Sequence, residues 1–535
     1  MKFRKILKVM YLLIFSLILI ACENDEIILP EEPNISSDTL EIYAINDFHG
    51  ALLRDDSNGF MGFSSIANYL KNNEPENQHV AIASGDIFQG ELLSNYYYGE
   101  PIIEVMNHLG FDAFTLGNHE FDWGIEEVTK YFDPSYEGLK ANFDLLGANV
   151  IDKQTNEIID FVKPYTIVHK NDLKIGIIGV MGDGLETSIS GDKVQNYQFT
   201  DAFTAIKKYS RILRADENVD VIIVSVHGAN SSLNQRVASL SGLEYVDAMF
   251  NAHTHAKYER FYSDANRKVE LPVIQSESKG TYLGNITLRF DEHKKVKSYT
   301  AKNMNHQTEN LLKTEDQEVL SIINKYYKNL EQQGFYDMIL PSEKSFDKAS
   351  ISVYLSYLMQ NYTAADLAIH NLGGTRETIA KNEKMSLAKI YQIMPFDNEV
   401  IVFNLYGSEL KKNISRNEKY IAYHSPSALH TFLDDQIYRI ATNRYVFEST
   451  NNYTFKDKAI GAYTIADKTM IPMFLDHLNL QKEEGQSYFN LNLSLSFPKQ
   501  SSNITQIYKR SNASFFLSSN HLTTYNLKGV LRSHR

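Results

Sequence analysis

The hexapeptide GNHEFD at residues 117–122 directly follows a short apolar run at residues 112–116. An apolar run of this length that ends in small and polar residues is typical of a buried strand leading into a loop. The loop carries an amide, an imidazole and two carboxylates, groups that bind metals or transfer protons. The stretch therefore predicts a buried strand whose carboxyl end delivers reactive side chains.

The same arrangement occurs at four other places in the chain. The apolar runs there are residues 40–45, 79–83, 219–226 and 246–250. They are followed by NDFHG (46–50), SGDIFQG (84–90), HG (227–228) and NAHTH (251–255). Ligands of open α/β sheets gather at the carboxyl ends of strands, and mixed oxygen and nitrogen donors suit Zn²⁺, Mn²⁺, Co²⁺ or Fe. Any one such loop is more often a turn or a helix cap, but five in succession favour a shared metal site.

Helical patterns alternate with these strands, which predicts an α/β fold. Residues 63–70 and 102–109 show amphipathic periodicity, and residues 173–180 form a further buried strand. The segment TEDQ at residues 314–317 has the form of a capping box, and the helix that it starts can end at Gly334.

A chain of 535 residues has room for two or three domains. We expect a signal peptide at residues 1–21, a tether at 22–38, a first domain at 39–310, a linker helix within 311–339, a second α/β domain at 340–485 and a tail at 486–535. The tail contains no Asp or Glu and is assigned no chemistry. It is interpreted as an edge strand with a loose end, or as a segment read in the wrong frame.

The overall charge and the cysteine content exclude several classes of protein. The formal net charge of −13 argues against binding to a nucleic acid polymer, which takes clustered Lys and Arg. The single cysteine, Cys22, excludes a disulfide within the chain and a zinc site built on cysteines.

The sequence of the N-terminus predicts an export signal. Residues 1–8 hold four basic side chains, and residues 9–21 are almost wholly apolar. The segment LIAC at residues 19–22 resembles a bacterial lipobox, which implies cleavage before Cys22 and lipidation of its thiol. The protein would then be anchored to the membrane outside the cytoplasm. The alternative is an ordinary signal peptide with an incidental cysteine.

The ordered motifs DxH, GDxxxG, GNHEFD, HG and HxH resemble those of the calcineurin-like metallophosphoesterases. Together with NLGGTR at residues 371–376, they resemble the bacterial 5′-nucleotidase family in particular, over residues 39–484. The resemblance implies a four-layer αββα sandwich, a linker helix and a smaller α/β domain that binds the substrate.

The resemblance also implies a pair of divalent metal ions, each Zn, Mn, Co or Fe. One would be bound by Asp47, His49, Asp86 and His255. The other would be bound by Asp86, Asn118, His227 and His253, so that Asp86 bridges the two. Ala252 stands where the family usually has Gly, and its one extra methyl group should be tolerated.

The catalytic residues that the resemblance implies all come from the GNHEFD motif. They are Asn118, His119 and Asp122. A hydroxide held between the metals would attack the phosphoryl group, while His119 stabilises its oxygens and assists the leaving alkoxide. Asp122 would orient the imidazole, although it also fits a helix N-cap. Glu120 is expected to be structural.

Substrate binding is expected in the second domain. The residues that match the family there are Asn371, Gly373, Arg376, Asn398, Tyr423, Tyr445 and Asn451. Tyr423 and Tyr445 would clamp the base between two rings. Asn451 stands where the family has an Asp that contacts the base, which leaves the base specificity open.

These expectations define three functions. The first is a surface-anchored enzyme that hydrolyses extracellular nucleotides to nucleoside and phosphate. The second is a 2′,3′-cyclic-nucleotide phosphodiesterase or a UDP-sugar hydrolase, which would take a nucleotide or a nucleotide sugar. The third is a catalytically inactive nucleotide-binding lipoprotein.

Overall fold

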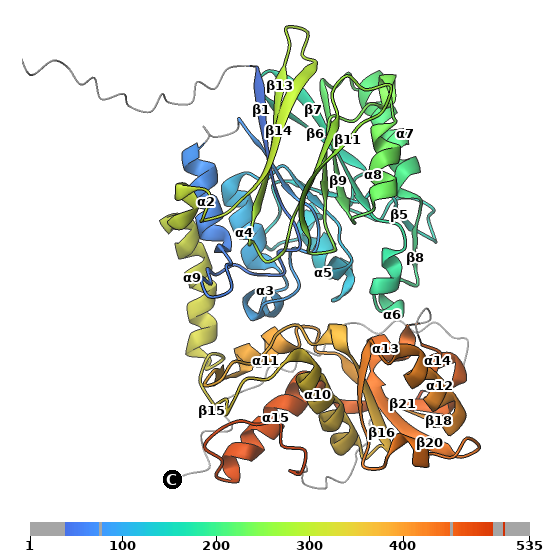
Figure 1. The fold of residues 1–535 in the computed structure, drawn as a ribbon. Coiled ribbons are helices and arrows are strands. Elements are labelled where there is room, and N and C mark those ends of the chain that lie inside the picture. Colours follow the sequence, from blue (N-terminus) through green and yellow to red (C-terminus); the bar gives the residue numbers. More distant parts are fainter. Residues whose placement is uncertain (1–37, 74–77, 450–452, 496–506, 509–535) are drawn as a thin grey trace, which may run out of the picture.

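The computed structural model describes residues 38–73, 78–449, 453–495 and 507–508 (Figure 1). The expected signal peptide, Cys22 and Asn451 lie outside the described residues. Within the described part of the chain, no helix is long and apolar enough to span a membrane.

The first domain is built on two six-stranded sheets. One sheet has the order β14 (Val296–Met304), β13 (Leu283–Phe290), β1 (Thr39–Ile45), β2 (Val80–Ala83), β3 (Ala113–Thr115), β4 (Asp144–Leu146). The other has the order β11 (Lys257–Tyr262), β12 (Leu271–Ser276), β10 (Ala248–Asn251), β9 (Val221–His227), β7 (Leu173–Met181), β6 (Tyr165–Lys170). Strands β1 to β4 are parallel, as are β7, β9, β10 and β12, so their carboxyl ends share one edge of each sheet.

The two sheets pack face to face, with helices on both outer faces (Figure 1). Ile42 of β1 and Ile177 of β7 belong to the core between the sheets. Their neighbours Tyr43 and Ile178 point to the opposite faces, because side chains alternate along a strand. Helices α2 (Gly62–Asn73) and α4 (Glu100–Leu109) cover one outer face, and α7 (Ala202–Ala215) and α8 (Ser231–Ala238) cover the other. The expected four-layer sandwich is confirmed.

Shorter elements complete this domain. They are α3 (Leu92–Tyr96), α5 (Glu126–Thr129), α6 (Gly191–Val194), and the paired strands β5 (Val150–Asp152) and β8 (Tyr197–Phe199). The six strands predicted from apolar runs are β1, β2, β3, β7, β9 and β10, each within two residues of its expected bounds. The predicted helices at 63–70 and 102–109 are α2 and α4.

Helix α9 (Gln317–Gln332) follows the first domain and packs against it through Val319 and Ile323. The predicted capping box at residues 314–317 is wrong. The cap is Asp316, whose carboxylate accepts a hydrogen bond from the Val319 N–H at 2.8 Å. The Thr314 hydroxyl instead accepts one from the Asn68 side chain of α2.

The second domain has one six-stranded sheet between two layers of helices. Its order is β19 (Ile421–His424), β16 (Leu367–Asn371), β20 (Ile437–Asn443), β18 (Glu399–Tyr406), β21 (Ile460–Thr469), β22 (Ile507–Tyr508). One face is covered by α10 (Lys348–Thr363), α11 (Leu387–Ile393) and α15 (Met470–Glu483). The other is covered by α12 (Gly407–Asn417), α13 (Arg444–Glu448) and α14 (Phe455–Lys458). Strands β15 (Leu340–Pro341) and β17 (Lys384–Met385) form a separate pair.

The second domain extends past the expected boundary at residue 485. Phe489 is fully buried in its core, against Phe346 and Phe474. Strand β22 pairs with β21 at the edge of the sheet, within the segment for which the sequence predicts an edge strand.

Candidate active site

The side chains that the sequence predicts as metal ligands meet at the carboxyl ends of the first domain's strands. They form two clusters, Asp47 with His49 and His255, and Asp86 with His227 and His253. In each cluster the possible ligand atoms lie within 4.8 Å of one another. The amide oxygen of Asn118 joins the second cluster, 3.2 Å from His227 Nε2 and 2.9 Å from His253 Nδ1.

The spacing inside each cluster fits a divalent cation. His49 Nε2 lies 3.1 Å from His255 Nε2, which lies 3.5 Å from Asp47 Oδ1. In the second cluster, His227 Nε2 lies 3.1 Å from Asp86 Oδ2. Donor atoms bound to a tetrahedral ion at 2.0–2.1 Å are separated by about 3.3 Å. Oxygen and imidazole donors in this mixture suit the transition metals expected from the sequence.

Contacts behind the ligands aim them at these two positions. His49 Nδ1 lies 2.9 Å from the Gln89 carbonyl oxygen, and His227 Nδ1 lies 2.9 Å from that of Ser84. A carbonyl oxygen only accepts, so each ring donates its Nδ1–H and leaves Nε2 free to bind a metal.

The backbone is strained at the ligands. Asp47, His49, Asp86, His253 and His255 all have positive φ, between 47° and 76°. Such conformations cost about 1–3 kcal/mol each and persist only where the surroundings enforce them, as they do at functional sites. The neighbouring glycines leave the required space, since a Cβ on Gly85 would lie 2.4 Å from His227 Nδ1.

Glu120 ties two of the ligand loops together. Its buried carboxylate accepts backbone hydrogen bonds from Gly117 and Asp86, both at 2.8 Å, and from Ile87 at 2.9 Å. Burial and the nearby Asp86 raise the pKa of Glu120 to about 7. The expectation that this residue is structural agrees with these contacts.

The protonation of the imidazoles also fits metal binding. Burial lowers the pKa of His253 and of His255 to about 4, so both rings are neutral, which is the form that binds a metal. Burial opposes a charge on His227, but the Asp86 carboxylate outweighs it and raises the pKa to about 10. The extra proton on His227 lies between its Nε2 and the Asp86 carboxylate, and a metal ion bound by these two side chains would replace it.

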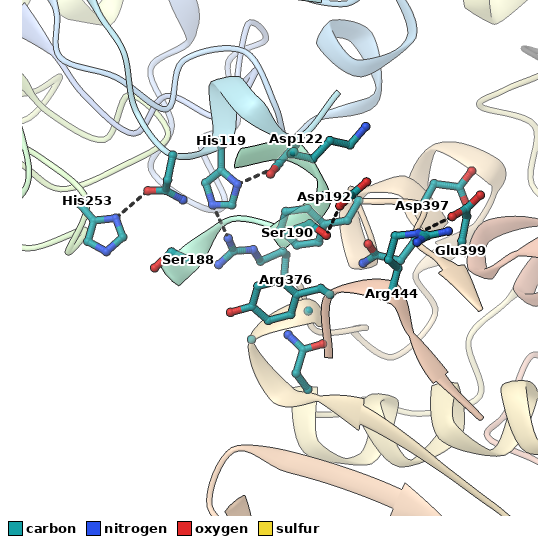
Figure 2. Close-up of a pocket in the computed structure, with 18 of the residues that line it drawn as sticks. His119, Asp122, Ser188, Ser190, Asp192, His253, Arg376, Asp397, Glu399 and Arg444 are labelled. Carbon is teal, nitrogen blue, oxygen red and sulfur yellow. Dashed lines mark hydrogen bonds and ion pairs between the residues drawn. The ribbon is translucent and has the colours of Figure 1, made fainter. Parts of the chain in front are cut away.

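His119 lies beside the second cluster, between partners from both domains (Figure 2). Its Nδ1 lies 2.7 Å from Asp122 Oδ2, and its Nε2 lies 3.0 Å from an Arg376 guanidinium nitrogen. Burial lowers the pKa of His119, but Asp122 and Asp86 outweigh it and raise the pKa. Helix α5 begins after Ile125 without a side-chain cap, so the alternative role of Asp122 as its N-cap is not observed.

A cavity of about 720 Å³ opens between the two domains next to His119 (Figure 2). Five of the residues predicted to bind the substrate line it: Asn371, Gly373, Arg376, Asn398 and Tyr445. Tyr423 does not line it. This residue lies on β19, an edge strand of the sheet, where it is 39% exposed.

Sequence reasoning missed two aromatic side chains that line the cavity, Phe396 and Tyr463. The Phe396 ring stacks on His119 with centroids 5.5 Å apart and an interplanar angle of 29°, and the Arg376 guanidinium lies 5.1 Å from its centre. The signal for Phe396 in the sequence is the segment PFDN at residues 395–398, of which only Asn398 is among the predicted substrate-binding residues.

Charged and hydroxyl-bearing residues at the other end of the cavity were also missed. The first domain contributes Ser188, Ser190, Asp192 and Lys193. The second contributes Glu399 and Arg444, whose Nε lies 2.5 Å from Glu399 Oε2 (Figure 2). No motif marks these positions in the sequence.

Known proteins resemble both domains. A family model for the calcineurin-like phosphoesterases matches residues 40–257, and a model for the 5′-nucleotidase C-terminal domain matches residues 343–433. The chain is 26% identical over 409 residues to endonuclease YhcR of Bacillus subtilis, across 70% of this chain and 32% of that protein. It is 25% identical over 389 residues to a snake venom 5′-nucleotidase of Gloydius brevicauda, across 66% of this chain and 64% of that protein. The chain thus spans only part of the length of each of these relatives.

The fold agrees with these matches. The crystal structure of a 5′-nucleotidase precursor from Thermus thermophilus aligns with a TM-score of 0.67 at 19% identity, covering 82% of this chain and 96% of that one. The two family models fall on the two domains of the structure, and the metal-ligand clusters lie in the first. The chain therefore belongs to the 5′-nucleotidase family, in which a calcineurin-like phosphoesterase domain is followed by a 5′-nucleotidase C-terminal domain.

Proposed function

We propose that this protein hydrolyses nucleoside 5′-monophosphates to nucleoside and phosphate. The observation that carries the proposal is the position of the two ligand clusters, the second of which borders, through Asn118 and His253, a cavity that holds cationic side chains and aromatic rings. Divalent cations in these clusters would supply an activated water and neutralise charge on the phosphoryl group. Asp47, His49, Asp86 and His255 would hold one cation, and Asp86, Asn118, His227 and His253 the other.

The chain's own residues orient and stabilise the phosphoryl group in this proposal. A phosphate placed between His119 and Arg376 would accept hydrogen bonds from both, replacing the contact that they make with each other. Asp122 keeps the imidazole oriented through Nδ1 and favours a proton on Nε2, which can pass to the leaving oxygen.

The nucleoside would lie deeper in the cavity, among second-domain residues. Phe396 and Tyr445 offer ring faces to a base, and base stacking contributes about 1–3 kcal/mol. The Asn371 amide can bond a ribose hydroxyl. Its Oδ1 accepts a hydrogen bond from Asn443 at 2.8 Å, which holds the amide orientation.

Hydrolysis of a nucleotide sugar is the second candidate. The charged far end of the cavity, with Asp192, Glu399 and Arg444, supports it because these groups can bond hydroxyls beyond the nucleoside. An inactive binding protein is disfavoured, since binding alone has no chemical need for both ligand clusters.

The test is product analysis with the purified chain from residue 23 onward, loaded with Mn²⁺ or Zn²⁺, because opening a cyclic phosphate or cleaving a pyrophosphate releases no free phosphate. AMP, 2′,3′-cyclic AMP and UDP-glucose are assayed, and metal content is measured on the same sample. We expect about two metals per chain and phosphate release from AMP. Two metals with tight nucleotide binding and no product from any of the three substrates would favour the inactive binding protein.

We further propose that the protein is anchored through a lipid on Cys22, outside the cytoplasm. The lipobox-like LIAC segment supports this. In a bacterial host, the full-length chain should sediment with membranes, while a Cys22→Ala chain should lose incorporation of labelled fatty acid. Equal labelling of both chains would exclude this anchor.

Replacing Arg376 with alanine should raise KM for AMP by about 10- to 100-fold, the equivalent of a lost hydrogen bond to a charged group. We expect a smaller change in kcat, because the ligand clusters do not include this residue. Arg439→Ala is the matched control, since Arg439 is in the same domain, bonds the Thr363 carbonyl and does not line the cavity. An unchanged KM in the Arg376 variant would remove it from the substrate site.

A further inference from the structure

An ion-paired cluster crosses the domain boundary beside the ligand clusters. Lys279 lies in the first domain, between β12 and β13. Its Nζ is 2.7 Å from Glu377 Oε1 of the second domain and 3.1 Å from Glu91 Oε1 of its own domain. All three side chains are mostly buried, with exposed fractions of 17%, 26% and 19%. One ammonium thus joins two carboxylates across the boundary.

The first-domain half of this cluster is attached to the backbone of two predicted metal ligands. The Lys279 N–H donates to the Asp47 carbonyl at 2.8 Å. The Glu91 N–H donates to the His49 carbonyl at 2.9 Å. Lys279, the partner of Glu377, and Glu91, the second partner of Lys279, are therefore both fixed relative to the first ligand cluster.

The second-domain half is attached to Arg376. Glu377 is its direct neighbour, and the Arg376 N–H donates to the Ile393 carbonyl at 2.9 Å. The Arg376 guanidinium reaches His119 at 3.0 Å. A displacement of Glu377 would therefore move the backbone that carries Arg376.

The electrostatics stabilise a charged lysine here. Burial lowers the pKa of Lys279, but Glu91 and Glu377 outweigh it and raise the pKa. A partly buried pair of this kind is screened by water much less than an exposed pair. Removing either partner leaves a charge with fewer compensating contacts.

We propose that Lys279 is a positioning residue. Its ion pair with Glu377 holds Arg376 beside the ligand clusters. The phosphate site therefore includes the Arg376 guanidinium only when the two domains are in contact. The inference rests on the proposed function for its kinetic consequence, but the contact itself does not depend on that function.

The test compares Lys279→Met, Glu377→Gln and the reversed pair Lys279→Glu/Glu377→Lys, the last in a Glu91→Gln background so that the new carboxylate does not face that of Glu91. The rate of backbone hydrogen–deuterium exchange in residues 372–377 reports whether the Lys279–Glu377 ion pair holds this segment, and the measurement does not require an active enzyme. Both single variants should exchange faster in this segment than the wild type, and the reversed pair should regain most of the protection. Exchange in α7 and α8, far from the contact, shows that each variant is folded.

The kinetic readout is a split between KM and kcat. Each single variant should raise KM for AMP by about tenfold, with kcat changed by less than about threefold, and the reversed pair should restore KM. Lys302→Glu is the control, because Lys302 pairs with Glu309 on the exposed surface of the same domain.

The outcomes separate the two proposals. Faster exchange at residues 372–377 in the single variants, with recovery in the reversed pair, supports the positioning role of Lys279, even if none of the chains hydrolyses a nucleotide. Unchanged exchange in both single variants would overturn it. Recovery no better than either single variant would overturn it as well.

Discussion

An Asp86→Ala variant should bind fewer than two metals per chain and hydrolyse AMP at the background rate. Asp86 is 1% exposed, and its Oδ2 lies 3.1 Å from His227 Nε2. Its negative charge also acts on His49 of the other cluster. Removing the carboxylate should therefore weaken both metal sites together. Metal content by elemental analysis and phosphate release, measured on one preparation, check this.

A control must separate metal loss from loss of stability. Asp201→Ala serves, because Asp201 caps α7 through the Thr204 N–H and lies outside the ligand clusters. Losing such a cap costs about 0.5–2 kcal/mol of stability but should leave two metals in place. Two metals per chain in the Asp86 variant would show that this carboxylate does not bridge them.

The sequence could predict the first domain and its ligands for a local physical reason. Parallel strands buried on both faces, such as β7 and β9, are nearly continuous apolar runs and stand out from their surroundings. The loops that follow the parallel strands meet at one edge of the sandwich because parallel strands share a direction. The positions of the strands were therefore enough to predict that Asp47, Asp86 and His227 lie near one another.

The features that escaped prediction depend on contacts between distant residues. Asp316 caps α9, and the Thr314 hydroxyl is instead engaged by Asn68, which is far away in sequence. Tyr423 and Phe396 are both aromatic, and residue type alone does not tell which of them lies at the cavity. The tertiary structure places Tyr423 on an edge strand of the second sheet and Phe396 at the cavity. The positive φ values of the ligands are imposed by the packed loops. Asp and His adopt this conformation more readily than most residues, but their residue type alone does not predict where it occurs.

A His119→Asn variant should lower kcat for AMP by about 10²- to 10⁴-fold, the usual contribution of a positioned acid or base. The metal content should stay at the wild-type value, because His119 belongs to neither ligand cluster. KM should change little, since Arg376 and the cavity rings remain. Steady-state kinetics and metal content on the same sample check all three.

The companion variant Asp122→Asn tests whether His119 acts through an oriented ring. The carboxylamide can still accept the Nδ1–H bond at 2.7 Å, but it no longer favours the charged imidazole. Its kcat should therefore fall less than that of His119→Asn, and the double variant should be no slower than His119→Asn alone. Additive losses would mean that Asp122 acts on the substrate by a separate route. If His119→Asn kept the wild-type kcat, His119 would not protonate the leaving group, and water would do so instead. The hydrogen bond between His119 and Asp122 would then only stabilise the loop.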